Sequence, residues 1–97
     1  QHALKQLWSV DQRRRSLRIA ILGDQWAALP ACLQALERRF PDFDEKDLPV
    51  ILSRSAALKR QAEQIIPQLD AQEVEVKHRL SEGVQALSRW IDLLRRQ

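Results

Sequence analysis

The chain has 97 residues, of which 44% are hydrophobic and 30% charged, and it carries a single cysteine. This length suits one small domain, and a lone cysteine excludes an internal disulfide. The net charge of +3 is spread evenly, because residues 1–48 carry eight Lys or Arg against seven Asp or Glu, and residues 49–97 carry eight against six. No uninterrupted apolar run reaches the roughly 18 residues of a membrane span, so no membrane insertion is expected.

Residues 3–22 are predicted to form the first helix. Its apolar residues recur every three or four positions, which places them on one face: Leu7, Val10, Leu17 and Ile21. Gly23 is predicted to end this helix, since glycine adopts the left-handed conformation of a helix C-cap, and Asp24 can cap the next helix. A joint this short predicts an antiparallel hairpin.

Residues 24–40 are predicted to form the second helix. Its stripe follows the same spacing: Trp26, Leu29, Leu33, Leu36 and Phe40. Pro30 lies near the helix start, so we expect a kink or an irregular first turn there, with no break. Cys32 sits at an apolar spacing and is expected to be a small buried hydrophobe. The acidic residues 42–47 are predicted to form a loop after Pro41.

The longest predicted helix covers residues 47–95, and the rest of the chain is organised around it. Pro67 stands near its middle, and residues Asp70 to Glu73 match a capping box. The helix therefore either kinks at Pro67 or breaks, with a fourth helix starting at Asp70; the nearly continuous periodicity favours the kink. The prediction is an all-α, antiparallel three-helix bundle, or a four-helix bundle if the chain breaks at residues 67–70, in a single domain over residues 1–97.

No catalytic, cofactor or metal site is predicted. His2 and His78 are the only histidines, and no Cys/His set has the spacing of zinc ligands. Gly23 and Gly83 are isolated, so no glycine-rich loop can hold a phosphate. The acidic residues 42–47 lack the glycine and the final glutamate of a calcium loop. We therefore expect no enzymatic activity and no cofactor.

Arginines and tryptophans are the remaining features with chemical interest. Arg13–Arg15 and Arg18 form the densest basic segment, which suits either phosphates or an acidic partner, or else a solvated helix flank. No aromatic residue lies among these arginines to stack on a base, so nucleic-acid binding is the weakest hypothesis. Trp26 is expected in the core, whereas Trp8 and Trp90 are expected on a rim or at an interface.

The layout of the chain resembles the FliT-type flagellar export chaperones. The matching features are Trp8 in the first helix, the joint Gly23–Leu29 that opens the second helix, the acidic break at 42–47, and the charged segment Gln72–Val76 followed by Leu80. They occur in the same order and spacing over nearly the whole chain.

This resemblance implies a cytoplasmic helical adaptor. Proteins of the family hold the unfolded end of the filament-cap subunit before export and deliver it to the export ATPase machinery, and some bind a flagellar transcription activator. Members of the family also carry a further carboxy-terminal helix that folds over the binding surface. The sequence reaches Gln97 directly after the long helix, which leaves open whether such a regulatory segment exists.

Three helices cannot cover every apolar position, so a partner-binding groove is predicted between the second and last helices. Its lining would be Ala28, Leu29, Cys32, Leu36, Val76, Leu80, Val84 and Leu87. An amphipathic segment of a client would lie there; alternatively, these residues are simply core. Two further hypotheses stay open, namely a homodimeric scaffold paired through the long helix and a nucleic-acid binder that uses Arg13–Arg18.

Overall fold

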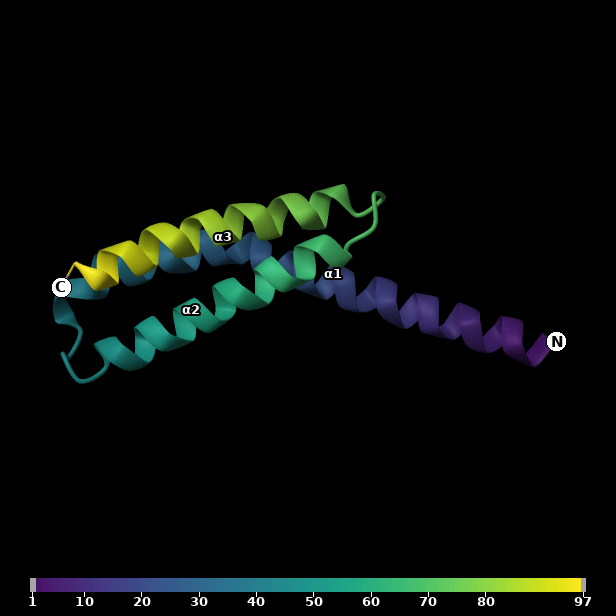
Figure 1. Cartoon of the computed structure of the whole chain (residues 1–97), viewed down its shortest axis with the longest axis horizontal. Helices are drawn as coiled ribbons and strands as arrows, with labels where there is room; N and C mark the ends of the chain where they lie inside the picture. The colour runs from purple at the N-terminus through teal and green to yellow at the C-terminus, as the bar shows by residue number, and fades with distance from the viewer. Residues whose placement is uncertain (1, 97) are drawn as a thin grey trace.

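The computed structural model describes the backbone of residues 2–96 and the side chains of residues 12–96, and this part of the chain is helical with no strand (Figure 1). Its helices are α1 (His2–Arg39), α2 (Leu48–Ile65) and α3 (Val74–Arg95), with short 3-10 turns η1 (Phe40–Asp42) and η2 (Ile66–Gln68). α3 runs antiparallel to α2 and parallel to α1. The all-α prediction is confirmed, but the helices differ from those predicted.

The two helices predicted at 3–22 and 24–40 are one continuous helix, so the predicted joint is wrong. No glycine of the described chain has a positive φ, and Gly23 lies inside α1. A Cβ on Gly23 would sit 3.1 Å from Val76 Cγ2, so the missing side chain lets α3 approach closely. Asp24 does not cap a helix; its carboxylate lies 3.5 Å from the Arg79 guanidinium. The helix also continues through Pro30.

The helix predicted at 47–95 is two helices separated at the proline. Pro67 lies in η2, the chain becomes extended at Leu69, and α3 begins at Val74. Pro67 has no amide hydrogen to continue the helical ladder, so the favoured kink gives way to the break. The Asp70 amide donates to Glu73 Oε1 at 3.0 Å, but the predicted helix start at Asp70 is wrong, because Glu73 is the N-cap residue of α3 and makes no side-chain cap bond. The number of helices stays at three because α1 is not divided.

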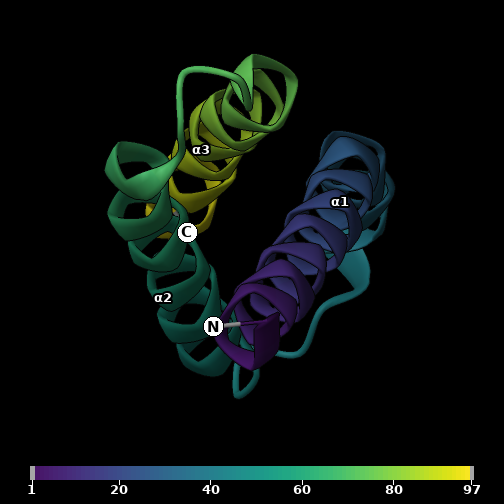
Figure 2. The ribbon, with the colours of Figure 1, turned by 90° about the vertical axis from the view of Figure 1, so that its right-hand side faces the viewer.

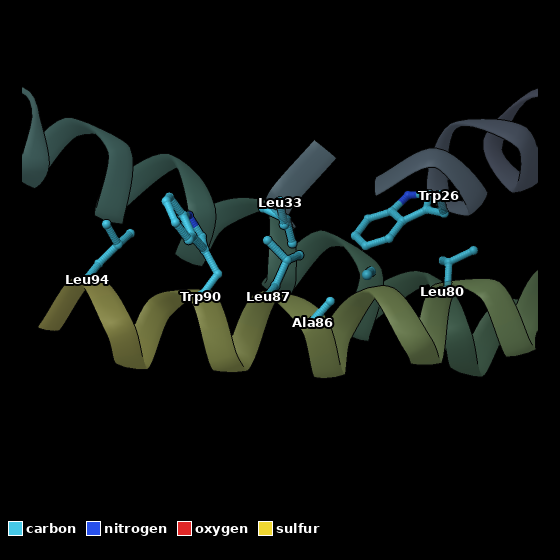
Figure 3. Packing of buried hydrophobic residues seen from close by; sticks show 8 residues of the cluster. Trp26, Leu33, Leu80, Ala86, Leu87, Trp90 and Leu94 are labelled. Atoms are coloured by element: carbon cyan, nitrogen blue, oxygen red, sulfur yellow. The ribbon is translucent and has the colours of Figure 1, made fainter. Parts of the chain in front are cut away.

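α3 is the central helix of the fold. It packs against both α1 and α2, whereas no described Cα of α1 comes within 8 Å of one in α2. Viewed from the end, α1 and α2 diverge on either side of α3 (Figure 2). One buried cluster joins all three helices, and α3 supplies five of its eight members (Figure 3): Trp26, Leu33, Ala62, Leu80, Ala86, Leu87, Trp90 and Leu94.

The molecule is elongated because α1 is much longer than its partners. Its principal extents are 60 × 23 × 20 Å and its radius of gyration is 17.2 Å, against about 13 Å for a compact chain of this size. At 1.5 Å per residue, α1 spans about 57 Å and α3 about 33 Å. The amino-terminal part of α1 therefore projects beyond the other helices (Figure 1).

Candidate functional site: the outer face of α1

The structure separates the two halves of the predicted groove. On α3, Leu80 and Leu87 are fully buried, and Val76 and Val84 are half-buried against the core. On α1, Leu29 also packs on the core, whereas the remaining three residues are exposed: Ala28, Cys32 and Leu36. The α3 residues therefore belong to the core or pack against it, and only Ala28, Cys32 and Leu36 of the predicted set lie on an open surface. The expectation that Cys32 is buried is wrong.

The exposed residues of α1 belong to a longer apolar surface. We define the outer face of α1 as Leu17, Ile21, Ala28, Cys32, Ala35 and Leu36, all of which are exposed. At about 100° per residue, most of this set lies opposite the buried Trp26, with Leu36 at the edge. The exposed fractions of the three largest members, Leu17, Ile21 and Leu36, are 64%, 57% and 38%. An uncovered apolar stripe of this kind is typical of an interaction surface.

The composition of α1 bears on the expectation that no segment inserts into a membrane. The segment Gln12–Asp42 contains a window that is long and apolar enough to cross a membrane, by length and composition only. Residues 19–36 include a single charged residue, Asp24. Only 17% of the apolar window is buried, although Trp26 and Leu33 bury one side of α1 against α3. Core helices of soluble proteins, which are mostly buried, and signal sequences near the amino terminus pass the same test. The low buried share of this window shows how much apolar surface α1 leaves open.

Gly83 and Trp26 fix how α1 lies on α3. A Cβ on Gly83 would overlap the Cε3 and Cζ3 atoms of the Trp26 ring. The indole therefore lies directly on the backbone of α3, where only glycine leaves room for it, and its exposed fraction falls to 6%. Figure 3 shows this ring above α3, between Ala86 and Leu80. The inner side of α1 is thus committed to α3, and the outer face points away.

The basic segment of α1 divides into one paired arginine and three open ones. Arg15 Nη1 lies 2.9 Å from Glu73 Oε1 and 3.4 Å from Asp70 Oδ2. Within residues 12–96, no ion pair involves Arg13, Arg14 or Arg18, and all three are exposed. Arg15 therefore holds α1 against the α2–α3 loop, and its three neighbours are directed to solvent at one end of the outer face.

Glu73 is the acceptor that anchors this contact. Its side chain is 15% exposed, and its Oε1 accepts from both Arg15 and the Asp70 amide. Burial tends to raise the pKa of Glu73, but the hydrogen bonds from Asp70 and Arg15 outweigh it and hold this pKa below the ordinary value. The hydrogen bond to Glu73 in turn raises the pKa of Arg15. Both groups are therefore charged at neutral pH, and their ion pair joins α1 to the residue that precedes α3.

The three tryptophans have different outcomes. Trp26 is buried, as predicted, but Trp90 is also buried, with 4% exposed, so the rim or interface position expected for it is wrong. Trp90 Nε1 donates to Ser55 Oγ at 3.1 Å, and Ser55 Oγ donates to the Ile51 carbonyl at 2.7 Å. The side chain of Trp8, like that of His2, lies outside the described residues. Ser55, a buried polar residue of α2, therefore satisfies a buried indole.

Sequence reasoning missed three members of the outer face, namely Leu17, Ile21 and Ala35. Leu17 and Ile21 were predicted to share the buried stripe of the first helix, but both are exposed. Their angular position around the helix axis could have identified them, because in one continuous helix Leu17 lies about 180° from Trp26. Since a break was predicted at Gly23, Leu17 and Trp26 were assigned to separate helices and this angle was not considered.

The described residues contain no group of three His, Cys, Asp or Glu side chains that could hold a metal ion. The hollow at the α1–α3 seam is shallow and has a lining that differs from the predicted groove: Pro30, Leu33, Gln34, Glu37, Ala86, Arg89, Trp90 and Leu93. No family model, curated protein or solved structure matches the chain. Of the features behind the FliT-type resemblance, the Gly23 joint is continuous helix, whereas the acidic break lies between α1 and α2.

Proposed function

We propose that this chain is a helical adaptor that holds an amphipathic helix of a client protein on the outer face of α1. The observation that carries the proposal is the exposure of Leu17, Ile21 and Leu36 on a helix whose other side is fixed to α3. A helix with one side docked and one apolar side open presents a rigid platform to a partner helix. The proposal needs no bound cofactor and no catalytic group.

The more specific form of this proposal is a cytoplasmic export chaperone of the FliT type. Its client would be the filament-cap subunit of a flagellum, which it would pass to the export ATPase machinery. The order of the tryptophan in α1, the acidic break and the charged start of α3 supports this assignment. The predicted joint at Gly23 no longer does, so the resemblance rests on fewer features than the sequence suggested.

The experiment is a titration with a purified filament-cap subunit, read by calorimetry and size exclusion. Ala28→Glu and Cys32→Glu place a charge on the outer face, and we expect each to weaken binding by about tenfold or more. Gln85→Glu introduces the same charge at an exposed site on α3 and should leave the affinity unchanged. Binding that survives both outer-face substitutions would contradict the proposal. Circular dichroism of all three variants checks that the fold is retained.

A homodimeric scaffold is the second candidate, and the projecting end of α1 favours it. This part runs past α3 (Figure 1), and isolated helical segments of this length are only marginally stable in water. A second copy could supply the missing contacts. Sedimentation equilibrium over a wide range of dilution distinguishes the two candidates, since an obligate dimer gives no folded monomer.

A further inference from the structure

We infer that the partner of the outer face is an acidic-ended amphipathic helix, that is, a helix whose apolar stripe is bounded at both ends by carboxylates. This inference rests on the proposed function and names the chemistry of its client. It comes from the distribution of charge along α1.

Arginines bound the outer face at both of its ends. Arg14 and Arg39 are 25 positions apart, so they point in directions that agree within about 20° and are separated by about 37 Å along the axis. Both are exposed, and neither takes part in an ion pair within residues 12–96. Arg18 flanks the first end and Arg38 the second. A partner helix lying along this stripe meets positive charge where it begins and where it ends.

The positive charge of the whole chain is concentrated on this segment. Residues 12–39 carry six arginines against Asp24 and Glu37, a net charge of +4, while the complete chain carries +3. The remaining residues therefore sum to −1. Arg15 is bound to Glu73, which leaves five arginines of this segment for a partner. Asp24 lies 3.5 Å from Arg79 but stays 84% exposed, so arginines outnumber the carboxylates that a partner meets on α1. Such a field favours and orients an acidic partner.

The size of the side chains favours a helix over a bilayer. The middle of the outer face carries Ala28, Cys32 and Ala35, which are small and allow another helix to approach closely. The same small residues contribute little apolar area for insertion into lipid. Asp24 also lies beside this middle region with its side chain 84% exposed, and a carboxylate is costly at the centre of a bilayer.

Charge also argues against a second copy on this face. In an antiparallel pair of α1 helices, Arg14 of one copy meets Arg39 of the other, and a parallel pair places each arginine beside its own equivalent. Like charges oppose each other in both arrangements. The occupant that relieves this repulsion carries acids at its ends.

Cys32 provides a direct readout, because it is the only cysteine and lies exposed in the middle of the face. Two cysteine-free synthetic helices share one stripe of leucine and phenylalanine; one has glutamates at both ends, about 37 Å apart, and the other has lysines there. We expect the glutamate peptide to slow maleimide modification of Cys32 by about tenfold or more at saturation, and the lysine peptide to bind at least about tenfold more weakly. Added salt should reduce this difference.

Charge reversal on the protein completes the test. Arg14→Glu combined with Arg39→Glu should lower the affinity for the glutamate peptide by about tenfold or more and raise the affinity for the lysine peptide. Arg54→Glu combined with Arg60→Glu makes the same change in charge at exposed positions of α2 and should leave both affinities nearly unchanged. Equal protection of Cys32 by the two peptides would overturn the acidic chemistry but leave client-helix binding standing.

The other outcomes separate the remaining occupants. Protection by neither peptide overturns the inference, and the filament-cap titration then decides the proposed function on its own. Protection that grows with protein concentration without peptide would identify a second copy. Protection by phosphatidylserine vesicles that exceeds protection by the glutamate peptide would identify a bilayer. Each of these results excludes the acidic-ended helix as the preferred partner.

Discussion

The two interfaces of α3 achieve close contact in opposite ways. On the side of α3 that faces α1, Gly83 has no side chain, so Trp26 lies directly on the α3 backbone. On the side that faces α2, α3 carries the large side chain of Trp90, whose indole donates a hydrogen bond to Ser55. In the core, the first interface depends on the fit of Trp26 to Gly83, with the Arg15–Glu73 ion pair outside the core. The second interface combines burial with a hydrogen bond. Substitutions should therefore affect the first mainly through steric fit and the second through an unpaired polar group.

The largest expected effect is the loss of the indole at the α1–α3 interface. Trp26→Ala should lower the free energy of unfolding by about 3–5 kcal/mol, because it removes a buried aromatic side chain and leaves a cavity. Urea unfolding followed by circular dichroism measures this change. Leu17→Ala, on the outer face, should cost no more than about 0.5 kcal/mol. Similar losses at the two positions would mean that Trp26 does not hold α1 on α3.

The effect of Gly83→Ala on stability should change sign when Trp26 is removed. Gly83→Ala should cost about 2 kcal/mol in the natural chain, because the added Cβ overlaps the Trp26 ring. In the Trp26→Ala background, the same substitution should stabilise the protein by up to about 1 kcal/mol, since alanine favours the helix over glycine.

A double-mutant cycle of these two changes measures their coupling by urea unfolding. Gly23→Ala is the matched control, because its Cβ would meet only Val76 at 3.1 Å and the Arg79 side chain at 3.4 Å, and we expect a smaller loss. Additive effects of Trp26→Ala and Gly83→Ala would show that the ring does not lie on Gly83.

The α2–α3 interface should respond to loss of its hydrogen bond. Ser55→Ala leaves the buried Trp90 Nε1 without an acceptor, so we expect a loss of about 1–3 kcal/mol. The tryptophan emission should also shift as the indole loses this partner. Ser53→Ala, at an exposed position of the same helix, should have no measurable effect. Equal stabilities for the two variants would mean that water or another group satisfies Trp90.

The smallest effect concerns the ion pair at the start of the α1–α3 contact. The pKa of Glu73 is lowered in the folded state, so its contribution to stability is present above the ordinary pKa and is lost as the pH falls through the lowered value. Glu73→Gln should reduce the shift in urea midpoint between about pH 6 and about pH 3. Glu63→Gln, an exposed substitution on α2, should retain the full shift. An unchanged pH dependence in Glu73→Gln would remove the role of this carboxylate.

The sequence predicted the buried residues better than the helix boundaries. Trp26 and Leu33 were placed on an apolar stripe by their spacing alone, and the structure buries both. Leu80 and Leu87 were assigned to the binding groove, with core as the alternative, and both are buried. Spacing is a reliable guide because burial repeats with the helix turn wherever one face packs.

The predicted helix boundaries were wrong at Gly23 and at Pro67. Glycine is equally suited to ending a helix and to admitting a close neighbour, and at Gly23 the second use applies, because Val76 lies against it. Only the position of α3 decides between these uses, and no local pattern reports it. At Pro67 the periodicity continued through the break, since two antiparallel helices packed on each other can keep the same apolar spacing.

The candidate site was predicted only in part. Ala28, Cys32 and Leu36 lie on an open surface, whereas Leu80 and Leu87 of α3 are buried and Val76 and Val84 are half-buried against the core. Deciding which of two apolar faces of α1 remains open depends on where α3 docks. That choice follows from the fit of Trp26 to Gly83, which is a property of tertiary structure.

The amino-terminal part of α1 projects beyond α2 and α3 (Figure 1). A client helix held along the whole of α1 would project with it, and at that end it would have only α1 to contact. A client that follows the full helix would therefore lie on α1 backed by α3 at one end and on α1 alone at the other.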